Sequence, residues 1–287
     1  MNHSTNEFYA QIEQTLEGVR QRDFLGHSPN QMHEILYFPF EEKSVVKINN
    51  LEAKAYTISP IFNTVRYLMC LLNNPKGIKL TPKGNLPVKI VKQIYEQSFM
   101  PDENVDSGIV KLYQEEKSPI IHLAHILLNN SSFSKHRKGV LTLTKKGEKA
   151  LLNSSDLFNS LLKLYTLHIN WGYFDRFSSE NTGQLGFAFS IILLNNFGHK
   201  PQTDLFYCKK YYQAFPLLLE EFDAEFVRKE HYAFFCFRQR TIEGFFELFG
   251  LVASQNKKDF FEFNPVLASS FFYDLFSCEY PVPHELN

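Results

Sequence analysis

The phrase LTKKG at residues 143–147 repeats one that stands earlier in the chain as LTPKG at 80–84. Each phrase ends a short run of alternating apolar and polar residues, which predicts a strand, and each is followed by a segment of helical character. Leucine suits the core side of such a strand and threonine favours extended backbone. Glycine accepts the positive φ needed to leave a hairpin and enter a helix. Both segments therefore predict a strand that leads into a helix.

The repeat extends upstream of both phrases. SPI occurs at 59–61 and 118–120, and LLNN follows at 71–74 and 127–130. A serine before a proline is typical of a helix N-terminus, so each SPI predicts the start of a helix that ends at LLNN. Three phrases in one order, on matching elements, indicate an internal duplication.

Elements outside the repeat are less regular. The sequence predicts a helix over about 7–19 and a second one that begins at Ser28–Gln31, where serine, proline and glutamine form a capping box. Near the C-terminus it predicts a helix over 241–252, a strand over 260–263 and a final helix over 265–276. We expect a mainly α protein with small β-hairpins, divided into a helical segment 1–57, repeat units 58–104 and 105–155, and a Phe-rich helical half 156–287 that contains one more degenerate unit.

Phenylalanine is concentrated in the second half of the chain. Of 29 phenylalanines, 22 follow residue 150, which predicts a large aromatic core there. The one tryptophan, Trp171, lies in the aromatic segment 169–177. It fits two interpretations, an anchor for a protein partner or a core that joins the two halves.

Charge is distributed unevenly although the net charge is only −1. Residues 1–155 carry 19 Lys and Arg against 15 Asp and Glu, whereas 156–287 carry 11 against 16. This asymmetry indicates a basic working half and an acidic packing half.

The LTxKG segments resemble the wing of winged-helix domains. In regulators of the MarR and PadR type a wing strand ending in LTxxG leads into the last helix, and residues 143–151 look like that segment, with 80–87 as a variant. The 80–87 segment is also similar to one found in uncharacterised bacterial and plasmid-borne proteins. The resemblance implies tandem winged-helix-like units. The helices that end in LLNN are strongly apolar, so they do not look like recognition helices.

The two repeat hairpins are rich in lysine. Residues 75–92 hold five lysines and no acid, and 131–150 carry a net charge of +5. Lysines on a hairpin suit phosphate contacts, although they are also common on solvated edges. The candidate nucleic-acid-binding residues are Lys79, Lys83, Lys89, Lys135, Arg137, Lys138, Lys145, Lys146 and Lys149.

The sequence gives only weak indications of a metal site or a catalytic site. His122 and His125 stand three apart on one helix, but structural histidines explain them better than a metal site. Asp175, Arg176 and Glu180 fit a solvated loop better than a dispersed catalytic site. The chain has no nucleophile elbow, phosphate-binding Gly-rich loop or zincin motif, so we expect no enzyme, no metal and no cofactor.

Cysteine spacing and hydrophobic stretches indicate where the protein is located, and the charge pattern indicates its partners. The four cysteines form no C-x-x-C pair and fit buried free thiols, and neither a secretory signal nor a membrane span is recognisable. We therefore expect a cytoplasmic protein. It either binds DNA or RNA through the two lysine-rich hairpins as a non-enzymatic regulatory protein, or serves as a scaffold of degenerate winged-helix units that docks a protein partner through the region around Trp171.

Overall fold

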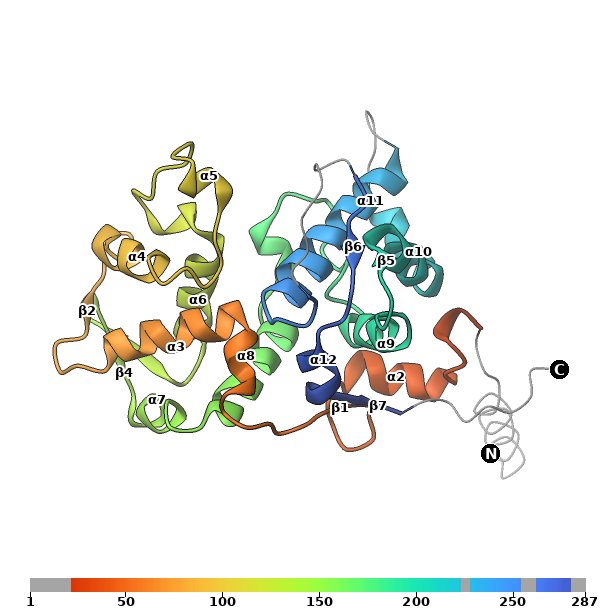
Figure 1. The fold of residues 1–287 in the computed structure, drawn as a ribbon, viewed down its shortest axis with the longest axis horizontal. Helices are drawn as coiled ribbons and strands as arrows, with labels where there is room; N and C mark the ends of the chain where they lie inside the picture. The colour runs from red at the N-terminus through yellow and green to blue at the C-terminus, as the bar shows by residue number, and fades with distance from the viewer. Residues whose placement is uncertain (1–21, 223–227, 254–261, 280–287) are drawn as a thin grey trace, which may run out of the picture. The chain divides into compact units, whose positions relative to one another are not determined.

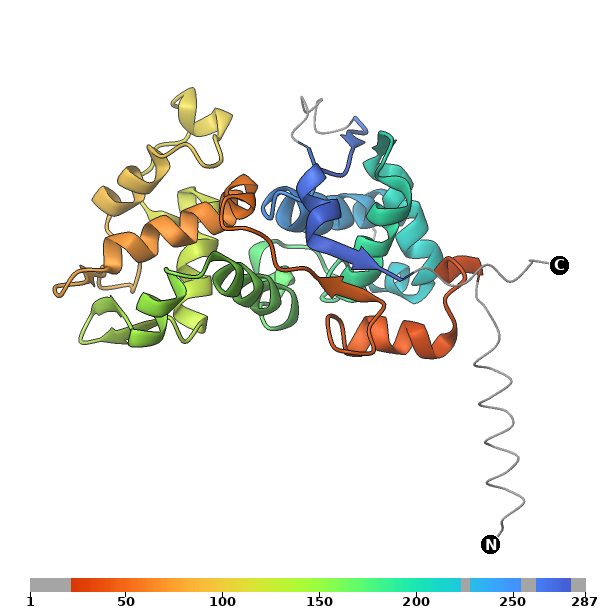
Figure 2. The same cartoon turned by 60° about the horizontal axis from the view of Figure 1, so that its bottom comes forward.

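The computed structural model describes residues 22–222, 228–253 and 262–279 (Figures 1 and 2). By its internal contacts the chain divides into two compact units. Unit 2 consists of residues 50–169 and 245–251, and unit 1 consists of the described parts of 1–49, 170–244 and 252–287. Both units are mainly helical with small antiparallel sheets, as the sequence predicted.

Unit 2 is a helical unit with one three-stranded sheet. Its elements are η2 (Ala55–Ile58), α3 (Pro60–Leu72), β2 (Ile78–Lys79), α4 (Val88–Tyr95), α5 (Glu103–Asp106), η3 (Glu115–Lys117), α6 (Pro119–Asn130), β3 (Ser134–Arg137), β4 (Val140–Leu143), α7 (Lys145–Ala150) and α8 (Ser154–Leu167). Both SPI phrases begin helices, α3 and α6, which pack against each other. At α3 the Ser59 hydroxyl accepts a hydrogen bond from the Phe62 amide, whereas Ser118 makes no such bond.

The strands of unit 2 join the two copies of the repeat. Antiparallel pairing gives the order β2-β4-β3, so a strand from the first copy adds to a hairpin from the second. The duplication predicted separate units at 58–104 and 105–155, each with a hairpin. Within 58–104, all of which is described, the structure has one strand, and that strand pairs with Val140 and Leu141. Both copies therefore contribute to one unit.

Unit 1 is assembled from distant parts of the chain. Its elements are η1 (Arg22–Phe24), α2 (Pro29–Tyr37), β1 (Val46–Ile48), η4 (Trp171–Phe174), α9 (Phe187–Phe197), β5 (Gln202–Thr203), α10 (Asp204–Ala214), η5 (Pro216–Glu221), α11 (Lys229–Phe237), β6 (Pro265–Val266), α12 (Ser270–Leu275) and β7 (Phe276–Cys278). Strand β1 pairs with β7, and β5 pairs with β6. The π-helix η6 (Arg238–Glu247) begins in unit 1 and ends in unit 2.

Several expected boundaries differ from the structure. The described part of 1–57 does not stand alone, because β1 pairs with β7, and α8 belongs to unit 2 although 156 was the expected boundary. The expected helix 241–252 is instead η6, which ends at Glu247. The last helix begins at Ser270 rather than 265, because Pro265 and Val266 pair with β5.

Two expected elements lie wholly or partly outside the described residues. The helix expected over 7–19 lies outside the described residues, as do 260 and 261 of the strand expected over 260–263, and its remaining residues, 262 and 263, are not in a strand. The capping box at α2 is present as expected, with reciprocal bonds between Ser28 and Gln31.

Phenylalanine rings contribute to the cores of both units. In unit 1 the fully buried rings include Phe189, Phe237 and Phe272. In unit 2, Phe158 of α8 lies among Tyr56, Phe62 and Phe249 at ring-centroid distances of 4.9–6.0 Å. The aromatic residues of the second half thus supply part of the core of unit 2 as well as that of unit 1.

Candidate functional site

The hairpin β3–β4 turns through two residues. Lys138 and Gly139 both have positive φ, 49° and 75°, which is the backbone of a type I′ turn and matches the twist of the flanking strands. Arg137 therefore stands opposite Val140, and Lys135 stands opposite Thr142.

Strand β2 completes the sheet on the other side of β4. Lys79 also pairs with Val140, so Lys79, Val140 and Arg137 form one row across three strands, and residues in one row point to the same face. The neighbouring row contains Ile78 and Leu141, which are buried at 6% and 0% exposure and so mark the core face.

The opposite, solvent side carries Lys79, Lys135 and Arg137, which we call the basic face. All three side chains are exposed. Strand pairing thus brings a lysine from the first repeat beside two cations from the second, across more than 50 residues of sequence. Within the described residues, none of the three forms an ion pair with an acidic side chain.

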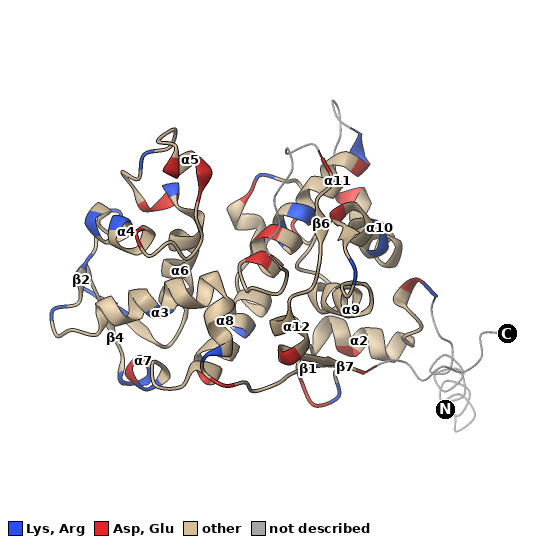
Figure 3. Cartoon of the chain, viewed as in Figure 1, with Lys and Arg blue, Asp and Glu red and all other residues tan. Residues whose placement is uncertain are grey.

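The other six predicted cations lie in turns and on helices of unit 2, outside the strands that form the basic face. Lys138 is in the hairpin turn, Lys83 in the turn after β2 and Lys89 on α4. Three more lie on α7, namely Lys145, Lys146 and Lys149, of which Lys146 sits 5.9 Å from the centroid of the Phe133 ring. Figure 3 shows the basic residues on β2, α4 and α7 within unit 2.

An open pocket of about 390 Å³ adjoins the basic face. It lies between the C-terminal end of α3, the strands β3 and β4, and α7. The residues that line it are Leu72, Asn73, Asn74, Pro75, Lys135, Thr142, Leu143 and Glu148. Beside it, the backbone of Gly77 crosses so close to β4 that an added Cβ would lie 2.3 Å from the Leu141 carbonyl oxygen. No local pattern in the sequence marks this pocket, because its walls come from three separate segments.

The repeated phrase holds α7 against the sheet. The hydroxyl of Thr144 accepts from the Gly147 amide and donates to the Ser132 carbonyl at 2.7 Å. A Cβ on Gly147 would lie 2.2 Å from the Phe133 carbonyl oxygen. Gly147 is therefore required for close approach, whereas the sequence predicted a positive φ there. That prediction is correct for Gly84, whose φ is +84°.

The two histidines of α6 bind one buried carboxylate. Nδ1 of His122 lies 2.8 Å from Oε1 of Glu115, and Nδ1 of His125 lies 2.9 Å from Oε2. The Leu86 amide donates to the same carboxylate. Burial raises the pKa of Glu115, but the two histidines and the amide outweigh it and lower the pKa to about 2. Both histidines are thus held by a carboxylate, and Glu115 escaped notice because it precedes the helix.

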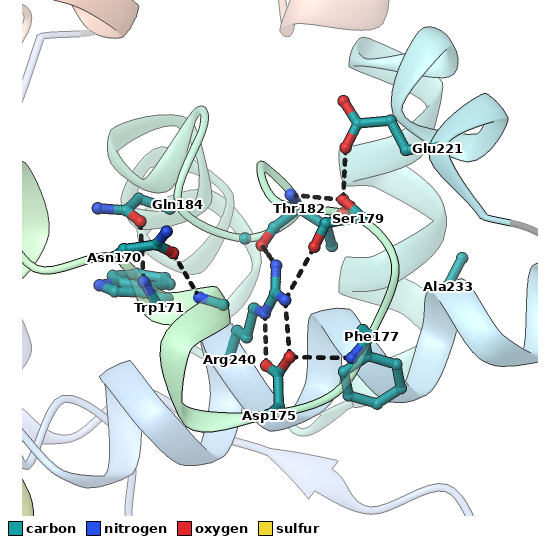
Figure 4. A network of polar contacts seen from close by, with 12 residues as sticks. Asn170, Trp171, Asp175, Phe177, Ser179, Thr182, Gln184, Glu221, Ala233 and Arg240 are labelled. Carbon is teal, nitrogen blue, oxygen red and sulfur yellow. Dashed lines mark hydrogen bonds and ion pairs between the residues drawn. The ribbon is translucent and has the colours of Figure 1, made fainter.

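A second buried network lies in unit 1 (Figure 4). The guanidinium of Arg240, in η6, makes two bonds to Asp175 at 2.6 and 2.8 Å, and further bonds to the carbonyls of Ser179 and Thr182. Ser179 in turn donates to Glu221 at 2.7 Å. Asp175 was expected in a solvated loop. Its carboxylate is buried because Arg240, 65 residues later, neutralises it, and no local pattern reveals that partner.

The aromatic segment and the cysteines match the expectations only in part. Trp171 is 1% exposed and packs near Phe187 in unit 1, so its own ring is not available as a partner anchor. Tyr173, two residues later, is 70% exposed. Cys70 is exposed because it lies on the solvent side of α3, whereas Cys208 and Cys236 are buried, and burial raises the pKa of Cys236 to about 12.

The described residues hold neither a candidate metal site nor a membrane-spanning helix. No group of three or more His, Cys, Asp and Glu side chains within the described ranges is arranged to hold a metal ion. In the same part of the chain, every helix is either too short or too polar to cross a bilayer.

Part of the chain is similar to a known protein family. A family model described as the Y4jL N-terminal domain matches residues 57–156, a span that runs from η2 into the first turn of α8. No curated protein and no solved structure matches the chain.

Proposed function

We propose that this protein is a non-enzymatic nucleic-acid-binding protein that contacts phosphates through the basic face of unit 2. The observation that carries the proposal is the strand pairing that gathers Lys79, Lys135 and Arg137 on one solvent-facing surface. Three exposed cations without acidic partners within the described residues suit a backbone of regularly spaced negative charge.

The proposed mode of binding does not read base sequence with a helix. In α6, the helix directly before the hairpin, most side chains are buried, including Ile121, Leu127 and Leu128. A helix with so few exposed polar groups cannot present donors and acceptors to a groove. Affinity then comes from charge neutralisation, and binding is strongly dependent on salt.

The arrangement of unit 2 also supports a winged-helix-like interpretation. Its order is helix α3, strand β2, the helices α4, α5 and α6 with the short η3 among them, and the hairpin β3–β4, and the first strand pairs with the last. The LTxKG segment that resembles a wing forms the junction between that hairpin and α7. Fold likeness alone does not fix a function, so the proposal rests on the charges and their placement.

The test is a fluorescence-anisotropy titration of the full chain against random duplex DNA, single-stranded DNA and RNA at low and moderate salt. We expect binding that weakens steeply with salt. The triple variant Lys79→Glu, Lys135→Glu, Arg137→Glu should bind roughly 100-fold more weakly at low salt and lower the slope of log K against log salt by about 3.

A matched control reverses three exposed lysines of unit 1, by Lys43→Glu, Lys200→Glu and Lys209→Glu. It has the same net charge as the test variant and should bind nearly as well as the unaltered protein. Equal losses in the two variants would show only a general charge effect and would contradict the proposed site. If none of the three nucleic acids binds at low salt, the proposal is wrong and the scaffold interpretation takes its place.

A further inference from the structure

The pocket beside the basic face combines donors and acceptors that have no partner in the protein. The side chains of Asn73, Lys135, Thr142 and Glu148 line it, and none of the four makes a hydrogen bond or an ion pair through its side chain within the described residues. Asn74, by contrast, is already bonded to the Leu71 carbonyl and the Lys76 amide.

The chemistry of the pocket does not suit a phosphate. Lys135 attracts an anion, but the Glu148 carboxylate on the facing helix repels it. Within the described residues no ion pair joins the two groups, so each can still bond to a ligand. A suitable ligand is a neutral, planar group that offers donors to Glu148 and acceptors to Lys135, while Leu72, Pro75 and Leu143 cover its apolar surface.

We propose that this pocket takes one unpaired nucleobase of the strand whose phosphates lie on the basic face, an inference that rests on the function proposed above. The volume of about 390 Å³ falls within the roughly 300–1,000 Å³ of small-molecule sites. Glu148 accepts from an exocyclic amino group such as that of cytosine, and Asn73 and Thr142 both donate and accept. Lys135 belongs to the basic face and to the pocket wall, so it links a phosphate to the base beside it.

Two consequences follow for the nucleic acid that binds. In a duplex the hydrogen-bonding edges of the bases are paired, so a base reaches a pocket only where it is unpaired or flipped out. The protein should therefore bind a single strand more tightly than a duplex of equal length at the same salt concentration.

The experiment compares two single strands that carry the same phosphates. One is oligodeoxycytidine and the other is an abasic oligonucleotide of equal length, both titrated with the full chain at mildly alkaline pH. We expect the cytidine strand to bind about tenfold more tightly, which corresponds to about one hydrogen bond to a charged group. Glu148→Ala should bring the ratio of the two affinities close to one, and Asn73→Ala, on another wall, should reduce it as well.

The matched control is Glu103→Ala. Glu103 is exposed and lies in the first turn of α5, as Glu148 lies in the first turn of α7, so both variants remove one carboxylate from the same kind of position. Using the ratio of affinities cancels the general gain in phosphate binding that follows from removing an acid. The control should keep the preference for the cytidine strand.

The outcomes separate this inference from the function on which it rests. If neither strand binds at low salt, the proposed function fails and the pocket inference with it. If both strands bind equally and with steep salt dependence, the basic face stands and the base pocket is wrong. A cytidine preference that both pocket variants leave unchanged also overturns the pocket.

Free cytidine 5′-monophosphate distinguishes a strand from a free nucleotide. It offers the same base but only one phosphate, so we expect it to compete only at concentrations far above the Kd of the strand. An affinity equal to that of the strand would overturn the assignment to a polymer.

Discussion

Glu115 is a buried carboxylate that ties three segments of unit 2 together. It accepts from the Leu86 amide before α4 and binds both histidines of α6. Because its pKa is about 2 in the folded protein and 4.5 is the ordinary value, the folded state favours the ionised form. This contribution to stability is fully present above about pH 4.5 and is lost as the pH falls towards 2.

We predict that Glu115→Gln lowers the free energy of unfolding of unit 2 by about 3 kcal/mol at neutral pH, because it removes a buried charge from its partners. The variant should also lose less stability than the unaltered protein between neutral and acidic pH, since the group that titrates is gone. Urea unfolding followed by circular dichroism at both pH values measures both effects. Glu116→Gln, at the exposed neighbour, is the control, and an unchanged acid sensitivity in Glu115→Gln would contradict the prediction.

The repeated phrase shows what single residues reveal from sequence alone. Gly84 and Gly147 hold the same place in the two copies, yet Gly84 has positive φ and open space beside it, whereas Gly147 lies in a helix against the Phe133 carbonyl. Sequence identifies both as glycine-dependent positions but cannot distinguish conformational freedom from close approach. The second depends on a segment that folds back from elsewhere.

At the scale of elements, helix boundaries with capping residues were predictable. Ser28, Ser59 and the LLNN ends placed α2, α3 and α6 correctly, because caps depend on neighbours within one turn. Strand partners were not. The pairing of β2 with β4 depends on contacts across some 60 residues. The repeated pattern suggested two separate hairpins, but the three strands form one sheet. The basic face depends on this pairing, and sequence listed its residues without showing which of them meet.

Arg240 illustrates an element held by a partner that is remote in sequence. Its four bonds fasten the segment 175–182 to η6, and its guanidinium is buried. We predict that Arg240→Lys lowers the free energy of unfolding of unit 1 by about 3 kcal/mol, although the charge is kept, because an ammonium cannot reproduce the planar two-bond contact with Asp175. Thermal unfolding monitored through the fluorescence of Trp171 reports on this unit.

The control for Arg240 is Arg22→Lys, a change at an exposed position on η1 in the same unit. It should leave the unfolding transition within error of the unaltered protein. Equal stability of Arg240→Lys would show that the network contributes little, and that water or relaxation replaces the lost bonds.

At the scale of the whole molecule, the path of the chain limits what sequence can predict. Capping motifs and periodicity correctly indicated a mainly helical protein, and the phenylalanine content indicated an aromatic core. The division into units was not predictable, because 22–49 joins the C-terminal elements through β1 and β7, and residues 245–251 return to unit 2. The family model that matches 57–156 therefore covers much of unit 2 but not its last segment.

That last segment completes the core of unit 2. Phe249 is fully buried, with its ring centroid 5.9 Å from Phe158 and 5.3 Å from Tyr165. The carbonyl of Leu248 also accepts from the Ser59 hydroxyl and the Ile61 amide at the start of α3. A continuous fragment of residues 50–169 lacks Leu248 and Phe249. The rings of Phe158 and Tyr165 on α8 would therefore be uncovered on the side that Phe249 packs against.

We predict that the isolated fragment 50–169 does not unfold cooperatively and binds a hydrophobic dye, because the loss of one buried phenylalanine alone costs about 3–5 kcal/mol, a large share of the stability of a small domain. A second fragment, in which residues 245–251 are attached to 169 by a flexible linker, should recover a cooperative thermal transition. Circular dichroism and dye fluorescence of the two fragments provide the comparison. If 50–169 alone melts as sharply, and at the same temperature, as the linked fragment, then the returning segment is a surface addition and unit 2 is specified by its continuous stretch.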